Sequence, residues 1–153
     1  MSARLTSNPE PEANLGYLFR LAYQRFRAAL DDALQDLALS AQEYVILSVF
    51  ETRSELSTSE LARITQVTRQ TMHTALLGLE SAGLLERRPK NQRVVLVRPT
   101  KRGRTALAAA TDRVRAVERT ALAGLSRNDE HAVRTWLANV ATTTTSTRPT
   151  TVK

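Results

Sequence analysis

Two short amphipathic segments with a tight turn between them, followed at once by a charged hairpin, constrain this chain most. In the first segment, Ser57 and Glu60 have the spacing of a capping box, in which each side chain binds the other residue's backbone amide. Thr68 is expected to cap the second segment, and Gly83 to end it, because glycine readily adopts the left-handed conformation. The core face of the second segment holds Met72, Ala75, Leu76 and Leu79. The pattern predicts two short helices joined by a turn.

A hairpin is predicted directly after the second helix. Two strand-like runs, LLERR and RVVLVR, flank a short turn expected at residues 89–91. Thr100 is expected to cap the long helix that comes next. Short helix, turn, helix and hairpin in this order predict a winged helix-turn-helix, whose second helix enters the major groove of DNA.

Longer helical patterns lie on both sides of this central part. Asn14 and Ser40 are expected to cap two helices before it, and Ser126 to cap one after the long helix at 101–123. The first helix is expected to bury Leu15, Leu18, Phe19, Ala22, Phe26, Ala29, Leu30, Ala33 and Leu37. The second is expected to bury Tyr44, Leu47 and either Val45 or Ile46. The predicted fold class is mainly α with a small β-hairpin wing.

Positive charge is concentrated in the central part. Residues 60–104 contain ten Lys or Arg and three acidic residues, which gives +7, and the whole chain, 22 minus 15, is also +7. The remainder therefore sums to zero. A local basic excess is typical of proteins that bind nucleic acid, so double-stranded DNA is the expected partner.

The polar face of the second short helix supplies the candidate base-reading residues. They are Thr68, Arg69, Gln70, Thr71, His73 and Thr74. Arg suits guanine and Gln suits adenine by bidentate geometry, and a Thr methyl group can contact thymine. Leu77 lies on the same polar face, and the sequence does not explain why an apolar residue stands there. Gly78, the next residue, lowers helix propensity by about 1 kcal/mol.

The hairpin supplies candidate contacts to the DNA backbone or minor groove. They are Arg88, Lys90 and Arg93, with Arg93 on the wing and Lys90 at its tip. Alternate strand residues face opposite sides, so Arg87 and Arg88 cannot both point at DNA. Arg98 could also reach the DNA, but the pattern fits equally well with an exposed strand residue that makes no DNA contact.

Other classes of protein are disfavoured. Apolar runs such as residues 44–50 are too short to cross a bilayer, and residues 1–10 lack the apolar core of a secretory signal. The chain has no cysteine, its five glycines are scattered, and His73 and His131 fall in different elements. A cytoplasmic protein that is not an enzyme and needs no cofactor is expected.

The order of these segments resembles the MarR family of bacterial transcriptional regulators over residues 16–140. The resemblance includes LGYLFRLAYQRFRAAL, LSAQEYVIL, STSELARITQVTRQTMHTALLGLESAGLLERRP, the wing NQRVVLVRPTKRG and the closing segment GLSRNDEHAVRTWLANV. It implies a homodimer on a pseudo-palindromic operator. Residues 14–39 and 101–140 would form dimerisation helices and 40–100 the DNA-binding lobe. Residues 1–13 are expected to be a flexible lead-in and 141–153 a disordered tail.

The resemblance also implies a ligand-responsive repressor released by a small aromatic or phenolic anion. The effector would bind where the dimerisation helices meet the DNA-binding lobe. Candidate ligand residues are Tyr17, Arg20, Tyr23, Arg27 and Tyr44, since each tyrosine has a hydroxyl to place and each arginine can pair with an anion. Phe19 and Phe26 are expected to serve in packing.

The sequence departs from the family pattern within the reading helix and the wing. Asn91 replaces the usual wing aspartate, Thr74 stands where arginine is common, and Leu77 and Gly78 replace an Asp-Arg pair. These departures motivate an alternative, a nucleoid or architectural protein that binds DNA without sequence preference. A methyltransferase fragment is a further alternative, but the chain ends without a cofactor-binding fold after its long helix.

Overall fold

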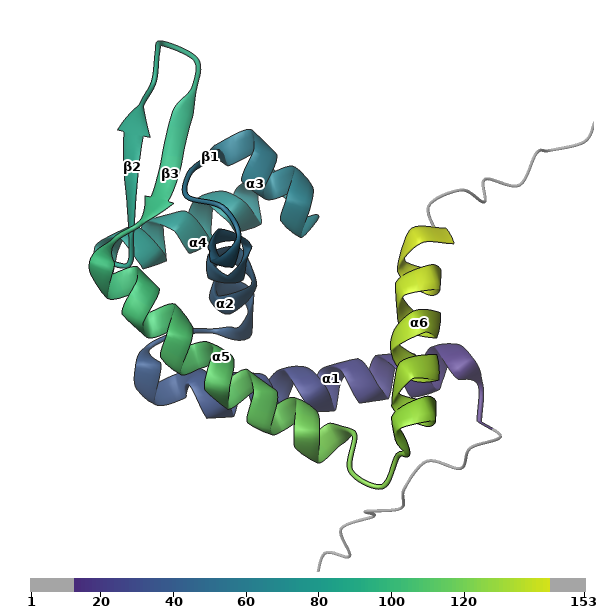
Figure 1. Cartoon of the computed structure of the whole chain (residues 1–153). Coiled ribbons are helices and arrows are strands. Elements are labelled where there is room, and N and C mark those ends of the chain that lie inside the picture. Colours follow the sequence, from purple (N-terminus) through teal and green to yellow (C-terminus); the bar gives the residue numbers. More distant parts are fainter. Residues whose placement is uncertain (1–12, 144–153) are drawn as a thin grey trace, which may run out of the picture. The chain divides into compact units, whose positions relative to one another are not determined.

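The computed structural model describes residues 13–143, which form two units, 13–117 and 118–143 (Figure 1). The first unit contains the helices α1 (Leu15–Leu34), α2 (Ala41–Ser48), α3 (Thr58–Thr65) and α4 (Arg69–Ser81) and most of α5 (Lys101–Ala121). Short 3₁₀ turns, η1 (Gln35–Leu37) and η2 (Val49–Glu51), follow α1 and α2. The second unit contains α6 (Arg127–Thr143). The mainly α class with a β-hairpin wing is confirmed.

Side-chain caps begin the helices where the sequence predicted them. Asn14 Oδ1 accepts the amide of Gly16 at 3.0 Å. Ser40 and Ser57 each form a complete capping box with the glutamate three positions later. Thr68 Oγ1 accepts the amide of Thr71 at 3.2 Å, and Ser126 Oγ accepts that of Asp129 at 3.2 Å. Local sequence therefore fixes these starting points.

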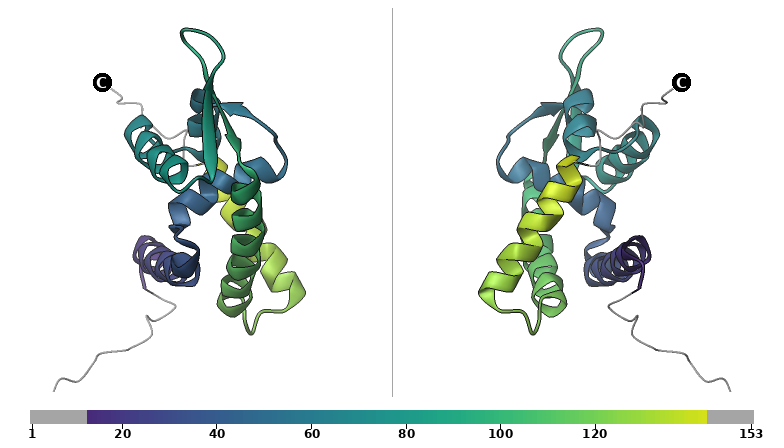
Figure 2. Two further views of the ribbon diagram at one scale, coloured as in Figure 1. Left: turned by 90° about the vertical axis from the view of Figure 1, so that its left-hand side faces the viewer. Right: turned by 90° about the vertical axis from the view of Figure 1, so that its right-hand side faces the viewer.

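The strands form a three-stranded antiparallel sheet in the order β1-β3-β2 (Figure 1). The sequence predicted β2 (Leu85–Pro89) and β3 (Val95–Pro99) but missed β1 (Leu56–Ser57), which is only two residues long. The turn predicted at 89–91 is in fact the loop 90–94, so Arg93 lies in the loop. Two views at right angles to Figure 1 show the hairpin tip projecting beyond α3 and α4 (Figure 2).

The core of the first unit lies beneath α4 and the sheet. Its fully buried side chains include Leu34, Ile46, Leu47, Leu61, Met72, Leu76, Leu79, Leu85 and Val97. All four residues predicted for the core face of α4 are buried. In α2 the structure selects Ile46, while Val45 is exposed.

The predicted apolar stripe of α1 is mostly outside this core. Leu34 is the one residue of α1 that is buried, and Leu15 is 58% exposed. Polar contacts hold the last turns of α1: Asp31 Oδ1 accepts the Ala41 amide at 2.7 Å, and Arg113 donates to the Ala33 carbonyl at 3.0 Å. The expectation that the whole apolar stripe of α1 is buried is wrong for a single chain. The N-terminal turns of α1 extend past the core of the first unit.

The ends of the predicted segments differ slightly from expectation. Helix α6 continues to Thr143, which is inside the segment 141–153 predicted to be disordered. The rest of that segment, and residues 1–12 of the predicted lead-in, lie outside the described residues.

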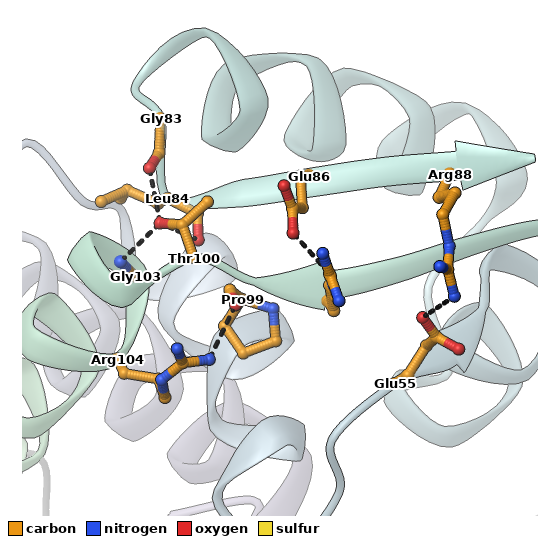
Figure 3. A network of polar contacts seen from close by, with 10 residues as sticks. Glu55, Gly83, Leu84, Glu86, Arg88, Pro99, Thr100, Gly103 and Arg104 are labelled. Atoms are coloured by element: carbon orange, nitrogen blue, oxygen red, sulfur yellow. Dashed lines mark hydrogen bonds and ion pairs between the residues drawn. The ribbon is translucent and has the colours of Figure 1, made fainter.

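The junction between α4, β2 and α5 is held by hydrogen bonds of Thr100 and by a close backbone approach at Gly103 (Figure 3). Gly83 has φ 70°, which ends α4 as the sequence predicted. Thr100 donates its amide to the Leu84 carbonyl at 3.0 Å and its hydroxyl to the Gly83 carbonyl at 2.7 Å, and its oxygen accepts the Gly103 amide at 3.0 Å. A Cβ at position 103 would overlap the Leu84 carbonyl oxygen and lie 2.9 Å from its carbon. Only glycine lets α5 approach this closely.

Gly103→Ala should lower the free energy of unfolding by about 3 kcal/mol or more, because two backbone segments must separate to admit the methyl group. Urea unfolding would measure the loss. Gly78→Ala is the matched control, since its Cβ would meet only the end of the flexible Glu43 side chain. That variant should stay within about 1 kcal/mol of the parent. Equal losses for the two would contradict the close approach at Gly103.

Candidate nucleic-acid interface

The outward face of α4 presents every predicted reading residue to solvent. Thr68, Arg69, Gln70, Thr71, His73 and Thr74 are all exposed, whereas Met72, Ala75 and Leu76 between them are buried. The Thr68 cap points the first-turn amides of α4 in a direction that favours an anion such as phosphate. The arrangement provides hydrogen-bonding side chains on an exposed helix face, and the major groove is wide enough to admit an α-helix.

The first turn of α2 lies beside this face, which sequence reasoning missed. A shallow hollow is lined by Ser40, Gln42 and Glu43 of α2 and by Gln70, Thr71, Thr74 and Ala75 of α4. Glu43 Oε2 accepts the Ser40 amide at 2.9 Å, and Oε1 would be 2.8 Å from a Cβ at position 78. Gly78 therefore leaves space for the Glu43 carboxylate. The sequence predicted Ser40 as the cap of α2, but it did not predict that this first turn lies beside α4.

A second hollow separates α3 from α4 at the base of the wing. Thr58, Ser59 and Ala62 of α3 line it with Arg69, Met72, His73 and Leu76 of α4 and Arg87 of β2. The two short helices thus leave a polar groove on the side where Arg69 and His73 are exposed.

The wing tip is shaped by Asn91. Its Oδ1 accepts the backbone amides of Arg93 and Val94, both at 2.9 Å, and the Lys90 amide donates to the Val94 carbonyl at 2.8 Å. Lys90 and Arg93 are exposed on this tip. Asn91 thus keeps the acceptor oxygen that an aspartate would provide and orders the backbone that carries Arg93.

Ion pairs engage other basic residues of the hairpin. Arg87 Nε donates to Glu80 of α4 at 2.9 Å. Arg88 pairs with Glu55 at 3.3 Å, and Arg98 pairs with Glu86 across the strands (Figure 3). The hydrogen bond from the Arg87 guanidinium holds the pKa of Glu80 below its ordinary value. Arg87 and Arg88 point to different sides, as strand alternation predicted. These pairs tie the base of the wing to its surroundings, and the tip keeps Lys90 and Arg93 exposed.

The candidate ligand residues lie on two helices. Tyr17, Arg20, Tyr23 and Arg27 are exposed on α1, while Tyr44 on α2 is half-buried against the core. The Arg20 guanidinium lies 5.7 Å from the centre of the Tyr17 ring, and Arg27 is 3.7 Å from Asp31. The structure brings Tyr17 and Arg20 together as a cation-π pair.

No group of three or more His, Cys, Asp or Glu side chains within residues 13–143 could hold a metal ion. No helix of this part of the chain is long and apolar enough to cross a membrane.

An exposed polar helix, a preceding short helix and a basic wing define a winged helix-turn-helix DNA-binding regulator. Residues 39–93 match the model of the MarR family. The chain is 36% identical over 117 residues to the HTH-type transcriptional repressor Rv2887 of Mycobacterium tuberculosis, covering 75% of this chain and 84% of that one. The chain belongs to the MarR family, which consists of transcriptional regulators rather than enzymes.

Solved structures show the same fold. A probable transcriptional regulator from Pseudomonas aeruginosa has a TM-score of 0.77 at 26% identity, with 86% of this chain and 99% of that one covered. Rv2887 in complex with DNA has a TM-score of 0.70 at 33% identity, covering 86% and 100%. Its complex with salicylic acid has a TM-score of 0.66 at 32% identity, covering 85% and 98%.

Asn91→Ala should weaken binding to every DNA sequence by up to about 30-fold, because each of the two lost backbone bonds contributes about 1 kcal/mol to the order of the tip. Fluorescence anisotropy would measure affinity, and amide hydrogen exchange at Arg93 and Val94 would report the tip directly. Asn91→Asp retains the acceptor and should protect both amides. If exchange and affinity are unchanged in Asn91→Ala, the tip does not depend on this side chain.

Proposed function

We propose that the chain is a homodimeric repressor that binds a pseudo-palindromic operator in the bacterial nucleoid and is released by a small aromatic anion. The observation that carries the proposal is the exposed reading face of α4 beside the basic wing tip, within a family of regulators. Arg69, Gln70 and Thr74 would contact base edges, and Thr68, Thr71 and His73 would support them. Lys90 and Arg93 would hold the backbone or minor groove, and Arg88 would do so by exchanging its pair with Glu55 for a phosphate.

Exposed apolar side chains support the homodimer. In the first unit, α1 exposes Leu15, Tyr17 and Tyr23, and in the second unit Val133 and Leu137 of α6 are exposed. A second copy that covered these faces would remove apolar area from water, which is the main driving force of stable association. Residues 14–39 and 101–140 are the proposed dimerisation segments and 40–100 the DNA-binding lobe.

Salicylic acid bound to Rv2887 supports an aromatic carboxylate as the class of effector. In this chain, Tyr17, Arg20, Tyr23 and Arg27 offer exposed rings and cations, and Tyr44 lies on the helix that begins the lobe. The guanidinium of Arg20 would pair with the carboxylate, and a tyrosine hydroxyl would orient the ring.

Selection of bound sequences from a random DNA pool should yield an inverted repeat. Arg93→Ala should then weaken all sequences alike and make the salt dependence of binding less steep by about one counterion, because a phosphate contact carries no sequence information. Gln70→Ala should instead change which sequence is enriched, by about 1–3 kcal/mol at the affected base pair. Protection of any duplex without an enriched sequence would favour the architectural alternative. Unchanged affinity and salt slope for Arg93→Ala would remove it from the interface.

Salicylate should raise the melting temperature by roughly 3–6 °C at a concentration about ten times its dissociation constant. Differential scanning fluorimetry against a panel of phenolic acids would measure the shift. Arg20→Met and Tyr44→Phe should each reduce it without lowering the melting temperature of the free protein by much, because neither side chain is fully buried. Absence of a shift with every acid in the panel would contradict the effector class.

A further inference from the structure

Leu77 is an apolar residue at the centre of a polar surface. It is 45% exposed, whereas Leu76 and Leu79 on the opposite side of α4 are buried. Seven residues of α-helix amount to nearly two turns, so Leu77 is offset from Gln70 by only about 20° around the helix axis. His73 and Thr74 lie on either side of that direction. Isolated exposed leucines are ordinary on protein surfaces, but this one shares its direction with the reading residues.

The neighbours of Leu77 leave its side chain unobstructed. On one flank Gly78 has no side chain, and the space beside it is taken by the Glu43 carboxylate. On the other flank Glu80 is drawn toward the wing by its hydrogen bonds with Arg87. The isobutyl group of Leu77 is therefore the side chain that meets a groove at this level of the helix.

The chemistry of the major groove limits what leucine can recognise. Base edges there present hydrogen-bond donors and acceptors, and the one apolar group among them is the C5-methyl group of thymine. A leucine set against the amino group of cytosine would remove water from a donor without replacing its hydrogen bond. Contact with a thymine methyl has no such cost and buries apolar area on both sides.

We infer that Leu77 is a specificity-determining residue that reads a thymine methyl group in the major groove. The inference rests on the proposed sequence-specific binding through α4 and adds a contact to it. Leu77 lies about 10 Å along the helix from Gln70, so the two side chains would meet different base pairs. It extends the reading surface beyond the first turns of the helix.

The test begins with the DNA sequence that the parent protein enriches from a random pool. Each thymine is replaced in turn by deoxyuridine, which removes only the methyl group, and affinity is measured for the parent and for Leu77→Ala. One thymine per half-site should lose about 4-fold in affinity with the parent, the value expected for one buried methyl group. Leu77→Ala should bind the thymine and deoxyuridine forms equally at that position.

Val45→Ala is the matched control, because it shortens a similarly exposed apolar side chain on α2, outside the reading helix. It should leave the Leu77-dependent thymine unaffected. If that thymine effect persists in Leu77→Ala, or disappears in Val45→Ala, Leu77 is not the reader. A change of oligomeric state in Leu77→Ala, measured by sedimentation, with unchanged methyl sensitivity would assign the side chain to a protein contact instead. Failure to enrich any sequence would overturn the proposed function together with this inference.

Discussion

The close approach of α5 to the end of α4 is the contact on which the lobe's geometry depends. Gly103 lies against the Leu84 carbonyl, and Thr100 binds the two carbonyl groups that follow α4. Because both contacts act on the backbone that follows α4, they fix the direction in which the chain leaves α4 and enters the hairpin. The reading helix, the wing and the long helix thus share one rigid junction (Figure 3).

This junction couples α5 mechanically to the reading helix and the wing. A side chain can change rotamer at little cost, but a helix packed on a backbone carbonyl moves only if its neighbour moves with it. Any displacement of α5 would therefore shift β2 and the end of α4. The Glu80-Arg87 pair links the same strand to α4 a second time.

The wing combines a fixed base with an accessible tip. Ion pairs hold Arg87, Arg88 and Arg98 at acidic side chains, and the Asn91 side chain orders the loop that carries Arg93. A surface ion pair contributes little to the free energy of folding, so the main effect of these pairs is to orient the strands of the wing relative to the rest of the first unit. Three of the ten cations of residues 60–104 are thus engaged in ion pairs with acidic side chains.

Much of the fold and part of the site followed from the sequence because they depend on local interactions. Caps at Asn14, Ser40 and Thr68, and the glycine that ends α4, involve residues a few positions apart, whose chemistry is the same in any fold. Helical period likewise separated Met72 and Leu79 from the outward face, and the local charge excess indicated DNA. The sequence alone therefore determined the winged helix-turn-helix and the face that would read bases.

Contacts between distant segments were decided only by the tertiary structure. The pairing of Leu56 with Val97, the position of Glu43 beside Gly78 and the packing of Gly103 on Leu84 join residues 19 to 41 positions apart. Periodicity describes one element at a time, so it assigned the whole stripe of α1 to a core that reaches only its last turns. The exposure of an apolar residue in a single chain depends on whether its helix or strand extends beyond the core. Local sequence does not encode how far each element extends.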